Sequence, residues 1–548
     1  MVALYNSGRY AELESRTRQM VEQFPAAAFA FKLLGGALLM QGKDALPAFQ
    51  KTAALMPDDA EAHYNLGVAL KNLGRLDEAV ASYRHALEIK PDYAEAYHNM
   101  GNALKELMQL DEAEASFRRA LKINPNMADS CSSLLLVTNY NASLTPSAYL
   151  AEARRYGQIV AAKVGSRFSA WRCAPDPKRL RVGVVSGDLR EHSVGHFLEG
   201  LLAHIDPAKI ELYAYPTQPD EDDLTARTKP HFAAWKPLFN LNDQAAAQLI
   251  HGDGVHILID LSGHTTYNRL PLFSWKPAPI QFTWIGLPAT TGVAEMDYIL
   301  GDPIAIPVED EGHFSERVWR LPESYLCFTA PEVDVEVGTL PALTSGFVTF
   351  ASFNNLAKMG KATIAVWARV LQAVPDSRLF LKTKQLKDAI VFDATIKQFA
   401  THGIEKSRLI LDGFLTPHRA DHLATYQRAD IALDTFPYRG VTTSAEALWM
   451  GVPVITLKGD RFLSRTAESI AYNAGLADWI AVDEEDYVAK AVFHATHLDR
   501  LATLRAGLRQ QVLGSALFNA PRFARNVEAA LWGMWQNHQG VSNNSKLI

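Results

Sequence analysis

Residues near the start of the chain recur at a spacing of 34 positions, and this spacing restricts the first quarter of the chain to a repeat architecture. Prolines recur three times, as Pro57, Pro91 and Pro125. Small and aromatic residues share the spacing: Gly67 with Gly101, Ala79 with Ala113, Tyr83 with Phe117, and Ala86 with Ala120. A period of this length predicts one two-helix unit per repeat, and such units are stable only when they stack on their neighbours.

Apolar spacing within one unit predicts two helices separated by a turn at 72–75. The marker residues are Leu66, Gly67 and Leu70 on the first helix and Ala79, Tyr83 and Ala86 on the second. These residues resemble the tetratricopeptide repeat. The resemblance is specific over about 60–93 and 94–127, a degenerate unit covers about 26–57, and half a unit covers 8–25. We expect repeats over residues 1–135.

Asn65 and Asn99 occupy the same position on successive first helices. A side-chain amide there can bind an extended peptide backbone, because it both donates and accepts hydrogen bonds. An ordinary exposed polar position is the alternative. The repeats are therefore expected to form either a scaffold or homodimer surface, or a peptide-binding face.

Strand and helix patterns alternate after a helical linker at 136–178, which ends in two prolines. The pattern predicts two Rossmann-like domains, at 179–335 and 346–516, followed by a C-terminal helix and tail at 517–548. The amphipathic stretch 505–537 is expected to pack across the first of these domains. Expected strands lie at 179–187, 210–215, 256–261, 279–284 and 297–300, and then at 347–352, 378–382, 408–411, 430–434 and 453–456.

The composition argues against several classes of function. The net charge is −6, which disfavours nucleic-acid binding, and three widely spaced cysteines predict neither disulfides nor a zinc site. No apolar run reaches the roughly 18 residues that cross a membrane, and the first residues show no signal pattern, so a cytoplasmic protein is expected.

The most informative motif runs from Asp434 to Thr456. A strand ends at Asp434, a loop turns at Gly440, and a helix opens at 441–443, where free backbone N–H groups and hydroxyls favour an anion. Glu446 lies one turn further along and could accept hydrogen bonds from a ribose. Ordinary helix capping by one of the threonines is the alternative interpretation. No Walker A or GxGxxG motif follows a strand, which disfavours NTPases and dinucleotide oxidoreductases.

This ensemble resembles the donor-nucleotide motif of glycosyltransferases with two Rossmann-like domains, the GT-B fold. Together with the repeats, the chain resembles a bacterial member of the O-linked N-acetylglucosamine (O-GlcNAc) transferase family. The resemblance implies inverting transfer of GlcNAc from UDP-GlcNAc to Ser or Thr hydroxyls, with an acceptor protein bound along the repeats.

Donor-binding residues follow from this resemblance by motif. In the segment 353–358, Lys358 is expected to contact the pyrophosphate, and Asn355 stands where the animal enzymes have Gln. The segment 416–422 matches the uridine-binding loop, and Glu446 replaces an aspartate. The expected donor-binding residues are Asn355, Lys358, Pro417, Arg419, His422, Val441, Thr442, Thr443 and Glu446.

Catalytic candidates follow the first strand of the first Rossmann-like domain, in the motif 186–196. His192 is the preferred residue and Asp188 the second, because both follow the carboxyl end of a strand. The alternative is that His192 caps the next helix and Asp188 binds loop amides. His196 is expected on the acceptor side, and Lys358 is expected to stabilise the departing phosphate.

Neither a metal nor a cofactor is expected. The pair Asp220 and Asp222 lies in a charge run typical of a solvated loop, and Lys358 with the helix start at 441–443 can replace a divalent ion. Two other functions stay open: a same-fold transferase with another donor or acceptor, such as GDP-fucose or an N-linking glucosyl transfer, and a nucleotide-sensing scaffold without catalysis.

Overall fold

The structure, a computed structural model, describes residues 1–141, 143–414, 416 and 418–545. It divides into two compact units, Met1–Thr138 and Asn139–Ile548. No helix in the described part of the chain is long and apolar enough to span a membrane.

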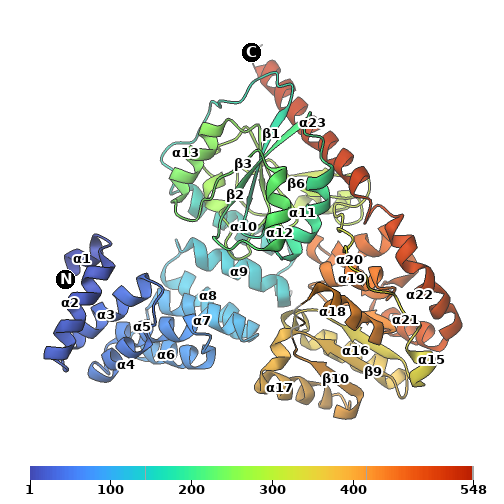
Figure 1. The fold of residues 1–548 in the computed structure, drawn as a ribbon, viewed down its shortest axis with the longest axis horizontal. Coiled ribbons are helices and arrows are strands. Elements are labelled where there is room, and N and C mark those ends of the chain that lie inside the picture. Colours follow the sequence, from blue (N-terminus) through green and yellow to red (C-terminus); the bar gives the residue numbers. More distant parts are fainter. Residues whose placement is uncertain (142, 415, 417, 546–548) are drawn as a thin grey trace. The chain divides into compact units, whose positions relative to one another are not determined.

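The first unit consists of successive antiparallel helices (Figure 1). They are α1 (Val2–Asn6), α2 (Tyr10–Gln23), α3 (Ala28–Met40), α4 (Leu46–Leu55), α5 (Ala60–Asn72), α6 (Leu76–Ile89), α7 (Ala94–Glu106), α8 (Leu110–Ile123) and α9 (Ala128–Asn141), whose last residues belong to the second unit. A Cβ built on Gly67 would lie 2.6 Å from the Tyr83 ring, and one on Gly101 would lie 2.7 Å from the Phe117 ring. Both rings are fully buried, so the recurring glycine makes room for the recurring aromatic residue. The predicted repeat architecture is confirmed.

The first α/β lobe of the second unit is a seven-stranded parallel sheet in the order β3-β2-β1-β4-β5-β6-β7. Its strands are β1 (Leu180–Ser186), β2 (Ile210–Pro216), β3 (Ala234–Trp235), β4 (Ile257–Asp260), β5 (Ile280–Thr283), β6 (Tyr298–Gly301) and β7 (Arg317–Arg320). Its helices are α10 (Pro146–Ala161), α11 (Ser193–His204), α12 (Asp223–Thr228), α13 (Asp243–Asp253) and α14 (Leu270–Phe273). The edge strands β3 and β7 are additions to the predicted set. One has two residues and the other is polar, so neither shows the apolar run of a central strand.

The second lobe is a six-stranded parallel sheet in the order β10-β9-β8-β11-β12-β13. Its strands are β8 (Thr349–Ser352), β9 (Arg378–Lys382), β10 (Leu409–Asp412), β11 (Ile431–Leu433), β12 (Val454–Leu457) and β13 (Ile480–Ala481). Its helices are α15 (Ala342–Ser345), α16 (Lys361–Ala373), α17 (Ala389–Ala400), α18 (Arg419–Ala424), α19 (Thr442–Trp449), α20 (Phe462–Asn473), α21 (Glu484–Thr496) and α22 (Leu498–Leu513). The strand order reverses between β8 and β11, where ligands of such sheets bind.

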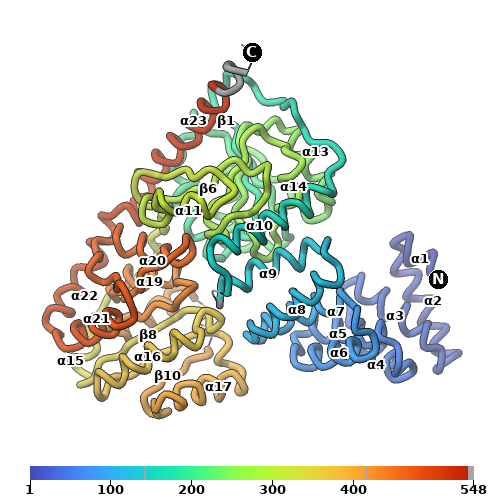
Figure 2. The backbone as a smooth tube through the Cα atoms, turned by 180° about the vertical axis from the view of Figure 1, so that it is seen from behind, coloured from blue at the N-terminus to red at the C-terminus, as the bar shows by residue number. Residues whose placement is uncertain are grey.

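The last helix, α23 (Ala520–Ser545), returns to the first lobe and lies beside α11 (Figures 1 and 2). The buried carboxylate of Glu528 accepts hydrogen bonds from the backbone N–H of Asp206 at 2.7 Å and from Lys209 at 3.1 Å. The expectation that the stretch 505–537 packs across the first Rossmann-like domain is confirmed for α23. It is wrong for the residues of α22, which pack against the second lobe, where Arg505 donates to the Ala429 carbonyl at 2.7 Å. Residues 514–519 separate α22 from α23, so the amphipathic stretch forms two helices.

Buried polar contacts join the two lobes. The hydroxyl of Ser469 on α20 donates to the Asp302 carboxylate after β6 at 2.5 Å, and Arg465 pairs with Asp310 at 3.1 Å. Because Ser469 and Asp302 are fully buried, this contact ties the two lobes to each other.

Candidate active site

The loop from β11 to α19 is held by buried polar groups at both ends. The carboxylate of Asp434 accepts hydrogen bonds from the Gly440 N–H at 2.7 Å and from the Thr456 hydroxyl at 2.8 Å. The guanidinium of Arg439 is 2% exposed and donates to three carbonyls, those of Thr435, Leu457 and Ser464. These contacts fix the loop, and with it the direction of the first turn of α19.

The first turn of α19 is open to an anion. Val441 precedes the helix, and none of the described side chains caps its N-terminus, so neither threonine plays the capping role of the alternative interpretation. The hydroxyl of Thr442 is buried and has no hydrogen-bond partner in the described part of the chain. The hydroxyl of Thr443 donates to the Asn354 side chain at 2.8 Å. Unpaired N–H groups and a buried unpaired hydroxyl are the features that a bound phosphate would satisfy.

A small cavity lies behind this turn, between the sheet and α19. Ser352 and Asn354 line it from the end of β8, and Asp434 and Thr443 line it from the other side. The residues that the sequence predicts to bind phosphate therefore lie where the strand order reverses.

Lys358 approaches the same loop from the short 3₁₀ helix Leu356–Lys358, which follows β8. Its Nζ donates to the Arg439 carbonyl at 2.9 Å and lies 4.2 Å from the centre of the Tyr438 ring. Burial lowers the pKa of this lysine to about 8, and the charge of Asp434 opposes that shift. Asn355 lies one turn before it with an exposed side chain, which caps the 3₁₀ helix and accepts a hydrogen bond from Gln385 at 2.7 Å.

The carboxylate of Glu446 is 2% exposed and binds three side chains. Arg419 donates to it at 2.5 Å, His422 contacts it at 3.3 Å, and the Tyr426 hydroxyl donates at 3.1 Å. Burial by itself would raise the pKa of Glu446, but the His422 hydrogen bond and the Arg419 charge outweigh it and lower the pKa to about 2. The structure thus brings together three of the predicted donor residues. Pro417, predicted from the same loop as Arg419 and His422, lies outside the described residues.

His192 is the N-cap of α11: its Nδ1 accepts a hydrogen bond from the Val194 N–H at 3.3 Å. The Nδ1 lone pair is therefore in use, and a neutral ring in this position carries its proton on Nε2. Asp188 Oδ1 lies 3.6 Å from the same nitrogen, and that carboxylate is buried. Burial raises the pKa of Asp188 and lowers the pKa of His192. The capping role for His192, considered from the sequence as an alternative, is present in the structure.

His196 lies one turn further along α11, and its Nε2 is 3.4 Å from the Glu191 carboxylate. Burial and, to a smaller extent, the charge of Arg419 lower its pKa to about 4, and the charge of Glu446 opposes that shift. Because Arg419 and Glu446 belong to the second lobe, this histidine faces the donor-side cluster across the interface between the lobes.

The two asparagines of the repeats are half-buried. The side-chain amide of Asn99 donates to the Tyr64 hydroxyl at 2.8 Å, so one of its donors is used inside the first unit. Tyr64 lies 35 positions earlier in the chain, and the sequence reasoning did not include it.

The described residues contain no group of three or more His, Cys, Asp or Glu side chains that could hold a metal ion. In the acidic run, Asp222 caps α12 and Asp220 pairs with Arg190 at 3.3 Å.

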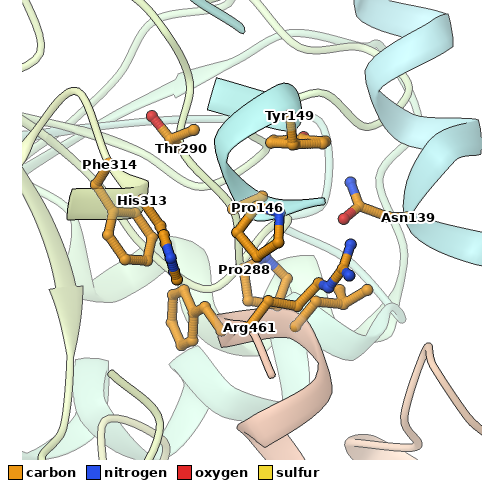
Figure 3. A pocket seen from close by; sticks show the side chains of 11 residues that line it. Asn139, Pro146, Tyr149, Pro288, Thr290, His313, Phe314 and Arg461 are labelled. Carbon is orange, nitrogen blue, oxygen red and sulfur yellow. The ribbon is translucent and has the colours of Figure 1, made fainter. Parts of the chain in front are cut away.

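A second small cavity lies at the contact of α10 with both lobes (Figure 3). Tyr149 and Pro146 enter it from α10, and Arg461 extends into it from the start of α20. The Arg461 guanidinium donates to the Leu144 carbonyl at 2.8 Å and binds Asp460. None of the residues predicted from the sequence lines this cavity.

Comparison with known proteins decides the family. The sequence model of Glycosyl transferase family 41 matches residues 159–330 and 337–527. The chain belongs to glycosyl transferase family 41. Tetratricopeptide repeat models match residues 48–81, 69–107 and 94–127, so this family member carries its repeats in the first unit.

Two relatives and one solved structure show how far the similarity extends. The chain is 36% identical over 411 residues to the Arabidopsis thaliana protein named probable UDP-N-acetylglucosamine–peptide N-acetylglucosaminyltransferase SPINDLY, with 74% of this chain and 44% of the relative covered. The Petunia hybrida protein of the same name is 36% identical over 377 residues, with 68% and 40% covered. The chain thus spans less than half the length of these two relatives. A mutant O-GlcNAc transferase from Thermobaculum terrenum superposes with a TM-score of 0.83 at 32% identity, covering 98% of this chain and 99% of that one.

Proposed function

We propose that this family 41 protein transfers N-acetylglucosamine from UDP-GlcNAc to Ser or Thr hydroxyls of proteins. The observation that carries the proposal is the open first turn of α19. The Thr442 hydroxyl there has no partner among the described residues, and the Lys358 ammonium is held by the carbonyl of Arg439, three residues before Thr442. A fixed ammonium group beside a helix N-terminus can bind the negative charges of a diphosphate. The full-length similarity to a protein named an O-GlcNAc transferase supports this sugar.

The donor would lie across the second lobe in three parts. The diphosphate binds Lys358 and the N–H groups at Val441, Thr442 and Thr443, with Asn355 beside them. The ribose binds Glu446, whose carboxylate retains lone pairs after its three contacts. The base lies against Arg419 and His422.

Transfer breaks the bond between the anomeric carbon and the β-phosphate oxygen and forms one bond from that carbon to the acceptor hydroxyl oxygen. Negative charge grows on the departing UDP, where Lys358 and the α19 dipole stabilise it without a metal ion. In-line attack inverts the anomeric carbon. The hydroxyl proton leaves to a base, for which Asp188 and His192 are the candidates. The carboxylate of Asp188 has free lone pairs and can accept the hydroxyl proton directly. The neutral His192 ring must first lose the proton on Nε2, because its Nδ1 lone pair accepts the Val194 N–H.

The acceptor would be a polypeptide bound along the repeats through Asn65 and Asn99, with its hydroxyl near His196. We expect the reaction to take place in the cytoplasm, without a cofactor.

The test is transfer from UDP-GlcNAc to a library of Ser- and Thr-containing peptides, followed by mass spectrometry, with and without EDTA. The proposal predicts a HexNAc mass increase that EDTA leaves unchanged and that Lys358→Met abolishes. Lys397→Met removes an exposed lysine on α17 and serves as the control. A parallel reaction with GDP-fucose must give no product. Fucose transfer alone would reassign the donor, and no transfer from either donor, with UDP still bound, would favour a nucleotide-sensing scaffold.

A further inference from the structure

The ammonium of Lys358 is held on two sides by the loop that precedes α19. One side is the Arg439 carbonyl, at 2.9 Å, and the other is the face of the Tyr438 ring, whose centre lies 4.2 Å from Nζ. A lysine ammonium has three N–H donors. The carbonyl takes one and the ring face takes the second, which leaves one for a ligand.

The Tyr438 ring is itself fixed. The Tyr140 ring packs against it with centres 4.7 Å apart and planes inclined by 43°. The Tyr438 carbonyl accepts a hydrogen bond from the Thr435 hydroxyl at 2.7 Å, and the next residue, Arg439, is anchored by its three carbonyl contacts. The ring therefore has little freedom to move away from the lysine.

We propose that Tyr438 is a positioning residue for the transfer reaction: its ring face, with the Arg439 carbonyl, aims the Lys358 ammonium so that its remaining N–H meets the diphosphate of the donor. This rests on the proposed function, because it assumes that Lys358 binds the diphosphate. Tyr438 acts through Lys358 and does not contact the reacting atoms.

The ring, and not the hydroxyl, performs this role, because a cation over an aromatic face interacts with the π electrons. The ring also favours the charged form of the lysine. Asp434, on the same loop, is the charged group that acts on Lys358 in the described part of the chain, and it too favours the ammonium. Without the ring, only the charge of Asp434 counteracts the effect of burial on the pKa of Lys358. The pKa should therefore fall, and the lysine should lose its proton at a lower pH.

The experiment is a double-mutant cycle on UDP affinity and on kcat/KM, using Tyr438→Phe, Tyr438→Leu, Lys358→Met and the double variant Lys358→Met/Tyr438→Leu. We expect Tyr438→Phe to stay within about twofold of the natural protein and Tyr438→Leu to lose about tenfold at pH 7. In the Lys358→Met background, Tyr438→Leu should cost nothing further. The pH at which UDP affinity declines should move downward in Tyr438→Leu and not in Tyr438→Phe.

The outcomes separate the proposal from its premise. Lys358→Met with unchanged UDP affinity would refute the diphosphate role of the lysine and so the proposed function. A tenfold loss in Tyr438→Leu that persists in the Lys358→Met background would overturn the positioning role alone, since it would show a structural effect. Equal losses in the Phe and Leu variants would also overturn it. If Tyr438→Leu does not fold, Tyr438→Met, whose flexible side chain fills a similar space, takes its place in the cycle.

Discussion

Replacing Lys358 should weaken diphosphate binding by an amount that depends on pH. Its ammonium already donates to the Arg439 carbonyl, and one N–H is left for a phosphate oxygen. Hydrogen bonds to charged groups contribute about 1.5–3 kcal/mol, which is roughly 10- to 100-fold in affinity. Lys358→Met should therefore raise the Kd for UDP by roughly 10- to 100-fold at pH 7.

The sign of the pH dependence follows from the lowered pKa. With a pKa of about 8, the lysine is about nine tenths protonated at pH 7 and about one tenth protonated at pH 9. Only the charged form attracts the diphosphate, so the natural protein should lose roughly tenfold in UDP affinity between these values. Binding in this range should take up a proton.

Calorimetric titration of UDP at pH 7 and pH 9 measures both effects. The pH dependence that remains in Lys358→Met comes from the titration of the nucleotide itself. Lys397→Met, at an exposed position on α17, shows how much affinity is lost when a positive charge far from the site is removed. The reasoning would be refuted by a pH dependence in Lys358→Met equal to that of the natural protein, or by a loss in Lys397→Met as large as that in Lys358→Met.

Three further predictions concern other parts of the chain. Glu446→Gln should weaken UDP binding about tenfold in calorimetry, because the neutral amide loses the charge-assisted contact with Arg419; an unchanged affinity would contradict the ribose role. Asp188→Asn should lower kcat by at least about 100-fold in steady-state assays while the UDP Kd stays the same, and a matching loss in Kd would show that the residue serves donor binding instead. Gly101→Val should lower the thermal stability of the repeat unit, since its Cβ would lie 2.7 Å from the buried Phe117 ring, and calorimetric melting should show the transition of the second unit unchanged.

The repeats and the central strands could be predicted because their signals are local in sequence. Gly67 and Tyr83 recur at a fixed spacing, and they do so because one makes room for the other. The loop of the proposed phosphate site could also be predicted, since its glycine, threonines and glutamate lie within seven residues of one another. The short or polar edge strands β3 and β7 carry no comparable apolar run, and so their sequence gives no signal.

Contacts between distant segments could not be predicted in the same way. Nothing near Lys358 in sequence indicates that its ammonium lies over Tyr438, 80 positions later. The role of His192 depends on whether its Nδ1 lone pair is free, and only the position of the Val194 N–H shows that it is used. Likewise, the Tyr64 partner of Asn99 becomes visible only when successive repeats stack.

A crystal structure of the protein with UDP would test the central claim most directly. The account predicts the diphosphate at the first turn of α19, with phosphate oxygens within hydrogen-bond distance of the Thr442 hydroxyl, the N–H groups of that turn and Lys358 Nζ. The account would be contradicted if the diphosphate lay elsewhere in the molecule while Lys358 and Thr442 stayed without contact to it.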